Sequence, residues 1–160
     1  MMKLPLIYLL LICAATFACA QDRTPGKVHA WYSLHHRGAQ MVDENGNPVG
    51  NNTDTAYTLL LELPAAYAKQ VSTDSACLGT KAWLVRQQAA VSGSVVLARQ
   101  MDTGGEIIYK AARGSVLLPL LAEEIGKTCS GKTLLYGRWQ GRPYRWTIPA
   151  PKALPPVFYP

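Results

Sequence analysis

Residues 126–133 read GKTCSGKT and fit the pattern G-x-x-x-x-G-K-[ST] of phosphate-binding loops. Such a loop joins a strand to a following helix, so that backbone N–H groups and the helix dipole point at the phosphate. Here the order is reversed, because a helix is expected before the match and a strand after it. The match also contains Cys129, which is expected to form a disulfide. We therefore interpret it as coincidental.

Three histidines and two carboxylates near the start of the chain are the next candidates for chemistry: His29, His35, His36, Asp43 and Glu44. Imidazole is the commonest side-chain metal ligand. His29 and His35 are expected on one face of one strand, but six residues of strand separate them by roughly 20 Å, too far to share an ion. No zinc-type spacing occurs. The sequence therefore predicts surface histidines, no metal and no cofactor.

The motifs of common enzyme classes are missing from the sequence. Neither G-x-S-x-G nor G-x-G-x-x-G occurs. Glu123 and Glu124 are expected on the solvated face of a helix. A hydrolase assembled from residues distant in sequence stays an alternative, because catalytic triads are defined by geometry. The sequence favours a protein that is not an enzyme.

The C-terminal part of the chain combines basic and aromatic residues and has no acidic residue over 125–160. Trp, Tyr and Arg dominate binding hot spots. The candidate binding residues are Arg138, Trp139, Arg142, Tyr144, Arg145 and Trp146. In the alternative interpretation the aromatic residues fill the core, and strand alternation places Arg138 and Arg142 on one face with Trp139 on the other.

The first twenty residues have the order of a secretory signal: the basic Lys3, an apolar stretch over residues 4–12, and Ala18-Cys19-Ala20 before the cut. The apolar stretch is shorter than the roughly 20 residues that span a bilayer. We expect cleavage after Ala20 and an exported protein, periplasmic or extracellular. Lipid attachment at Cys19 is the alternative, and only in that case do we expect attachment to a membrane.

Residues 21–160 then form a single exported domain of ordinary size. The whole chain carries 16 basic and 10 acidic side chains, a formal net charge of +6. This charge prescribes no partner. Basic and aromatic residues together also suit nucleic acid, but export disfavours it. Cys77 and Cys129 lie outside the signal and, in an oxidising compartment, are expected to form a disulfide.

Alternating and apolar segments predict several strands. The expected strands are 28–36, 56–63, 95–101, 106–111, 133–138 and 143–148, with hairpin turns at Asn45-Gly46, 102–105 and Gln140-Gly141. Residues 76–90 fit a helix or a strand, and a strand from Lys81 is favoured on pattern.

One firm helix is predicted over residues 115–126. Ser115 can cap it, Gly126 can end it, and apolar residues from Leu117 to Ile125 share one face. The Pro-rich tail, 149–160, is expected to strap across a surface without extending a sheet. These elements predict one α+β domain with a mostly antiparallel sheet.

A small exported domain without a catalytic motif resembles inhibitors and toxin-immunity proteins in kind only. The first functional hypothesis is a binding protein that inhibits or neutralises another protein with an acidic surface. An envelope protein that binds an anionic surface or a glycan is the alternative, beside the hydrolase.

Overall fold

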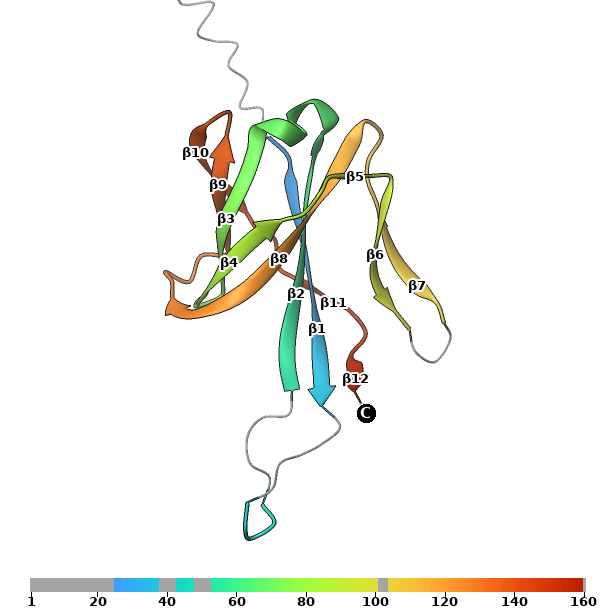
Figure 1. Cartoon of the computed structure of the whole chain (residues 1–160), viewed down its shortest axis with the longest axis vertical. Helices are drawn as coiled ribbons and strands as arrows, with labels where there is room; N and C mark the ends of the chain where they lie inside the picture. Colours follow the sequence, from blue (N-terminus) through green and yellow to red (C-terminus); the bar gives the residue numbers. More distant parts are fainter. Residues whose placement is uncertain (1–24, 38–42, 48–52, 101–103, 160) are drawn as a thin grey trace, which may run out of the picture.

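The computed structural model describes residues 25–37, 43–47, 53–100 and 104–159. Figure 1 shows a long sheet that curls into half a barrel, with a separate two-stranded hairpin beside it. The described elements are β1 (Lys27–Arg37), β2 (Thr53–Pro64), the 3-10 helix η1 (Ala65–Gln70), β3 (Val71–Leu78), β4 (Lys81–Gln87), β5 (Val91–Ser92), β6 (Ser94–Arg99), β7 (Glu106–Lys110), β8 (Ser115–Thr128), β9 (Leu134–Trp139), β10 (Arg142–Thr147), β11 (Lys152–Ala153) and β12 (Val157–Tyr159).

The strand order of the large sheet is β10-β9-β3-β4-β8-β2-β1-β11, with β5 also on β8 and β12 also on β1. All of these pairings are antiparallel except those of β11 and β12, which run parallel to β1. β6 and β7 pair only with each other. Within the described residues no ladder joins β10 to β1, so the half-barrel has an open seam.

The central strand β2 is buried on both faces, which explains its unbroken apolar run. Leu59, Leu60 and Leu61 are each at most 1% exposed. Leu59 and Leu61 belong to the main core inside the curl, whereas Leu60 joins Trp31 and Leu117 in a second core under the β6–β7 hairpin. Each fully buried leucine stabilises the fold by about 1.5–3 kcal/mol relative to an exposed one.

The predicted helix over 115–126 is wrong, and with it the α+β class. Residues Ser115–Thr128 form β8, which pairs with β2 on one side and with β4 and β5 on the other. Val116 and Leu118 face the main core while Leu117 faces the second core. A strand buried on both faces shows no alternation, so its pattern imitates a helix. No helix of seven or more residues occurs in the described part of the chain.

Proline is tolerated at position 119 inside β8 because the pairing with β4 and β5, on one side of the strand, is interrupted there. A backbone N–H at this position is therefore not needed for the ladder. The register with β4 ends at Leu120 and that with β5 begins at Leu117. The Pro119 carbonyl accepts a hydrogen bond from the Gln88 amide at 2.9 Å, so the side that lacks a donor faces this gap. Proline is tolerated in a sheet at such irregular positions.

The prediction that the tail cannot extend a sheet is also wrong. The tail does run extended as a strap, but it pairs with β1 in two short pieces, Trp31↔Lys152 and His35↔Val157 among the partners. The Leu154 amide also donates to the Tyr32 carbonyl at 2.8 Å. The pairing is possible because the strap lies at an edge, where proline interrupts a ladder with little cost.

Most of the other predicted strands are confirmed, including the ambiguous segment, where β4 begins at Lys81. The β9–β10 turn has φ 51° at Gln140 and 75° at Gly141, as a two-residue hairpin with primed turn geometry requires. The Asn45-Gly46 turn is present, held by the Asp43 carboxylate, but its flanks lie outside the described residues. Strand β3 was not predicted.

The predicted disulfide is confirmed. Cys77 at the end of β3 is bonded to Cys129 just after β8, with Cα atoms 6.1 Å apart. The phosphate-loop match joins two strands, because residues 126–128 belong to β8 and β9 begins at Leu134. The predicted signal, residues 1–20, lies outside the described residues. None of the described helices has the length and hydrophobicity to cross a membrane.

Candidate functional site

The β9–β10 hairpin carries all six predicted binding residues, and its register fixes which of them share a face. Arg145 lies opposite Tyr136 and Pro143 opposite Arg138. Trp146 lies opposite Leu135 on the other face, towards the main core. Because directly opposite residues of an antiparallel pair project to the same side, Arg138 and Arg145 share the outer face.

The three aromatic members of the set pack on the core side. Trp146 is only 4% exposed and belongs to the main core, while Trp139 and Tyr144 pack against that core and are partly buried. Their rings form a row, with centroids 5.9 Å apart for Trp139 and Tyr144 and 4.8 Å for Tyr144 and Trp146. The burial of Trp146 gives it a structural role, as the alternative interpretation expected of the aromatic residues.

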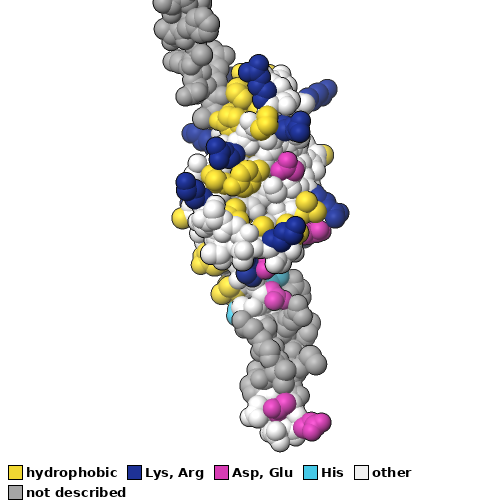
Figure 2. All heavy atoms as spheres, turned by 90° about the vertical axis from the view of Figure 1, so that its left-hand side faces the viewer, with side chains coloured by type: hydrophobic (Ala, Val, Ile, Leu, Met, Phe, Trp, Pro, Cys, Tyr) yellow, Lys and Arg dark blue, Asp and Glu magenta, His cyan; other side chains and the backbone are white. Residues whose placement is uncertain are grey.

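The three arginines are exposed, but the predicted common face of Arg138 and Arg142 is wrong. Arg142 lies opposite Trp139, on the core side at the end of the hairpin. The prediction continued the alternation of faces through the two-residue turn. In the hairpin Arg142 is instead the direct partner of Trp139, so both project to the same side. Figure 2 looks onto this side of the molecule and shows Lys and Arg side chains over the body, with few carboxylates between them.

A groove of about 760 Å³ runs along the outer face of the hairpin and is lined by Asp74, Tyr136, Arg138, Pro143 and Arg145, among others. Asp74 accepts a hydrogen bond from the Ser75 hydroxyl at 3.0 Å. In the described part of the chain no carboxylate lies within ion-pair distance of Arg138, Arg142 or Arg145. We call this surface the arginine groove.

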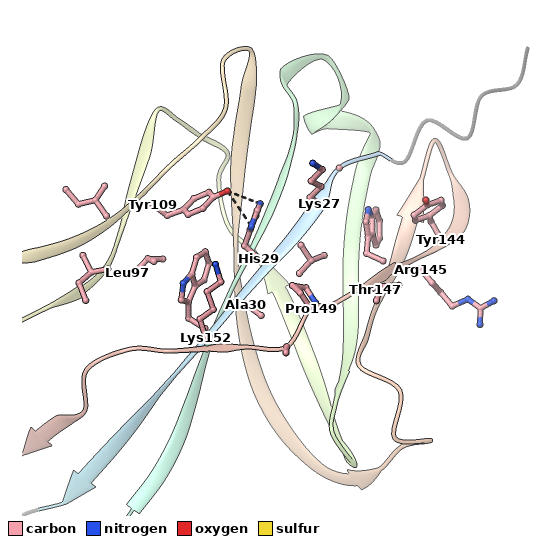
Figure 3. A pocket seen from close by; sticks show the side chains of 17 residues that line it. Lys27, His29, Ala30, Leu97, Tyr109, Tyr144, Arg145, Thr147, Pro149 and Lys152 are labelled. Atoms are coloured by element: carbon pink, nitrogen blue, oxygen red, sulfur yellow. Dashed lines mark hydrogen bonds between the residues drawn. The ribbon is translucent and has the colours of Figure 1, made fainter.

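A second and larger recess, about 840 Å³, lies where the half-barrel stays open. We call it the seam cleft. Figure 3 shows that β1, β10, the first part of the strap and the β6–β7 hairpin surround it. Its apolar lining includes Trp31, Leu97, Ile107, Tyr109 and Trp146.

A hydrogen-bonded cluster of His29, Glu62 and Tyr109 stands at one wall of the seam cleft. His29 Nε2 lies 2.8 Å from Glu62 Oε2, and the Tyr109 hydroxyl donates to the same oxygen at 2.9 Å. The Ala112 amide donates to Glu62 Oε1 at 2.6 Å. The cluster therefore ties β7 and the loop after it to β1 and β2.

The carboxylate of Glu62 is ionised and is held by hydrogen bonds from His29, Tyr109 and Ala112. Burial alone would raise its pKa, but the hydrogen bonds from Ala112, Tyr109 and His29 together lower it below the ordinary value. Burial, then the hydrogen bond and negative charge of Glu62, raise the pKa of Tyr109 to about 12. Tyr109 therefore remains a neutral donor across the physiological range.

The cluster fastens the β6–β7 hairpin to the large sheet. The Tyr109 hydroxyl lies 2.9 Å from Nε2 and 3.4 Å from Nδ1 of His29, so both ring nitrogens face the cluster (Figure 3). The described residues contain no group of His, Cys, Asp and Glu side chains that could hold a metal ion.

Sequence reasoning placed His29 on a solvated surface and missed the cluster. The signal that could have found it is Glu62, a single charged residue inside the apolar run of β2. A carboxylate in such a strand needs a partner, and an adjacent strand carried a histidine. Nothing in the sequence pointed to Tyr109, whose hairpin belongs to a separate sheet.

Comparisons with protein-family models, with curated proteins and with solved structures give no match to this chain.

Proposed function

We propose that this protein is an exported binding protein of the inhibitor or immunity type, which neutralises another protein by holding an acidic surface of it in the arginine groove. The observation that carries the proposal is the set of exposed arginines, Arg138, Arg142 and Arg145, none of which has a carboxylate partner among the described residues.

Arginine suits this task because its planar guanidinium makes several hydrogen bonds to a carboxylate at once. Arg138 and Arg145 flank Tyr136 on the rigid outer face of two paired strands. A tyrosine between two arginines adds apolar contact area at low entropic cost. Because the hairpin is already ordered, binding would require little rearrangement of this side.

The test is capture of a partner from the envelope fraction of the source cells by the immobilised chain from Gln21 onward. The captured protein is then purified and its affinity measured for the native chain and for Arg138→Glu with Arg145→Glu. We expect the charge reversals to weaken binding at least tenfold without lowering the melting temperature. The control, Lys110→Glu with Lys127→Glu, makes the same change in net charge at exposed positions outside the groove.

Equal affinity of the two double variants would reject the arginine groove as the binding surface. The alternative, binding to an anionic envelope surface, is checked with vesicles that contain anionic lipid. Binding to such vesicles that depends on Arg138 and Arg145, together with no captured protein, would favour that alternative.

A further inference from the structure

The seam cleft has the characteristics of a site for a small ligand, and the proposed function makes no use of it. Its volume of about 840 Å³ lies in the usual range for such sites, and most of its lining is apolar. One wall of the cleft is formed by Trp31 of β1 with Leu97 and Ile107 of the β6–β7 hairpin. The opposite wall includes Trp146 of β10. The walls come from strands, which gives the cleft a preformed shape.

The side chains that line the seam cleft include three basic residues, and the nearest carboxylate, Glu62, lies behind His29 and Tyr109, which hydrogen-bond to it. Lys27, Arg145 and Lys152 line it, and no Asp or Glu is among its described lining residues. The Arg145 guanidinium points away from the cleft in Figure 3. Lys152 is the ladder partner of Trp31, and Lys27 lies four residues before Trp31 on the same face of β1. Two lysines therefore flank the apolar wall that Trp31 contributes.

A buried donor also lines the cleft. The Trp146 indole Nε1–H has no hydrogen-bond acceptor among the described residues, although the side chain is only 4% exposed. Buried donors are nearly always paired. This Nε1 atom is closed to solvent, however, and the indoles of Trp83 and Trp139, outside the cleft, also lack an acceptor among the described residues, so the donor does not by itself identify a ligand.

We infer that the seam cleft binds a small amphiphile with an apolar body and one negative charge, such as a medium-chain carboxylate. The apolar body lies against the wall formed by Trp31 and the hairpin side chains Leu97 and Ile107. The anionic head pairs with Lys27 or Lys152 at the rim. The seam cleft shares Tyr144 and Arg145 with the arginine groove, but its apolar wall and its two lysines belong to the cleft alone, and the inference does not depend on the proposed protein partner.

Decanoate and decylammonium are the probes, because they share one apolar chain and differ in the sign of the head. Each is titrated, below its micellar concentration, into the 15N-labelled chain from Gln21 onward while the indole N–H resonances are followed. The four tryptophans supply an internal control, since Trp31 and Trp146 line the cleft while Trp83 and Trp139 do not. We expect decanoate to shift the first pair only, and decylammonium to bind more weakly.

The matched variants test the charges. Lys27→Glu with Lys152→Glu should weaken decanoate binding by about tenfold, because each exposed ion pair contributes a few-fold to affinity, and should improve decylammonium binding. Lys110→Glu and Arg138→Glu, both outside the cleft, should leave decanoate affinity unchanged. The dispersion of the spectrum shows that each variant is folded.

The inference is overturned if decanoate shifts none of the indole resonances or all four alike. It is also overturned if decylammonium binds equally well, or if the lysine reversals have no effect. These results would not decide whether the arginine groove binds a protein. That proposal is tested separately, by the affinity of the captured partner for the variant with Arg138→Glu and Arg145→Glu.

Discussion

Two outer surfaces of the same sheet differ in whether their charged side chains form ion pairs. On β4 and β8, Lys81 pairs with Glu124 at 2.9 Å and Arg86 with Glu123 at 3.3 Å. On β9 and β10, Arg138 and Arg145 have no carboxylate partner in the described part of the chain. Both surfaces are exposed and strand-built, and Asp74 lines the arginine groove, so the difference lies in whether a carboxylate comes within ion-pair distance of the cations.

The comparison shows where the net positive charge acts. Paired surface charges largely cancel at a distance, whereas unpaired cations create a field that steers an anionic partner. The paired surface also exposes apolar side chains, with Leu84 at 41% and Leu121 at 53%. The hairpin, beside the open seam, is therefore one part of the described surface where positive charge is not cancelled by a paired carboxylate.

The largest effect we expect comes from the core side of the hairpin. Trp146→Ala should lower the free energy of unfolding by about 3–5 kcal/mol, because it leaves a cavity in the main core. Urea unfolding measures the change. Arg142→Ala on the same strand is exposed and should change it by no more than about 0.5 kcal/mol. Equal stability of the two variants would mean that the hairpin does not close the core.

The disulfide lies at the boundary between the two surfaces, because β3 stands between β4 and β9. Cys77→Ala with Cys129→Ala should reduce the free energy of unfolding by about 2–4 kcal/mol, since the unfolded chain regains loop entropy. Denaturant unfolding checks this value. Native chain treated with reductant should unfold at the same denaturant concentration as the variant, and a clear difference would contradict the entropic account.

Salt should separate the two surfaces most clearly. Protein capture by the native chain should weaken by about tenfold between low and high ionic strength, because exposed charges are screened. In Arg138→Glu with Arg145→Glu this dependence should disappear or reverse, whereas Lys81→Gln, on the paired surface, should keep it. Association rates measured at two salt concentrations test this, and an identical salt dependence in all three proteins would refute the steering role.

Acid should release the β6–β7 hairpin before the rest of the sheet. The pKa of Glu62 is lowered in the folded state, so its contribution is present above the ordinary pKa of about 4.3 and is lost as the pH falls through the lower value. Glu62→Gln should therefore flatten the acid limb of the stability curve. Hydrogen exchange of β7 amides at several pH values measures this release, and an unchanged acid limb in the variant would argue against it.

The smallest effect belongs to the paired surface. The side chains of Lys81 and Glu124 are 60% and 39% exposed. Lys81→Gln should therefore cost about 0.5 kcal/mol or less, as expected for a solvent-screened pair. Thermal unfolding at two salt concentrations checks the value. A larger loss would show that the paired surface contributes to stability beyond its charges.

The sequence was sufficient where a strand has one solvated face or a defined turn. The β9–β10 hairpin was predicted from Gln140-Gly141 and its flanks, and the disulfide from cysteine count and compartment. It was insufficient for β8, where burial on both faces removes the period of two that marks a strand. The two glutamates of that segment matched the solvated face of a helix, and its proline was compatible with a first helical turn.

The candidate surfaces could be predicted only in part. The exposed arginines were evident from their spacing, but the face of Arg142 depended on how the turn resets alternation. The seam cleft was not predictable, because it needs β1, β10 and the separate β6–β7 hairpin to meet in space. Pairing between segments so distant in sequence leaves no local pattern.

The strap has a consequence for how the chain acquires its structure. β1 begins at Lys27, whereas its parallel partners lie at Lys152 and beyond, so this edge is completed only after nearly all of the described chain has emerged. Contacts this far apart in sequence slow folding. Until they form, β1 presents an unpaired edge, which is a template for pairing between chains. A chain that stops before residue 150 should therefore aggregate during synthesis even though its main core residues are all present.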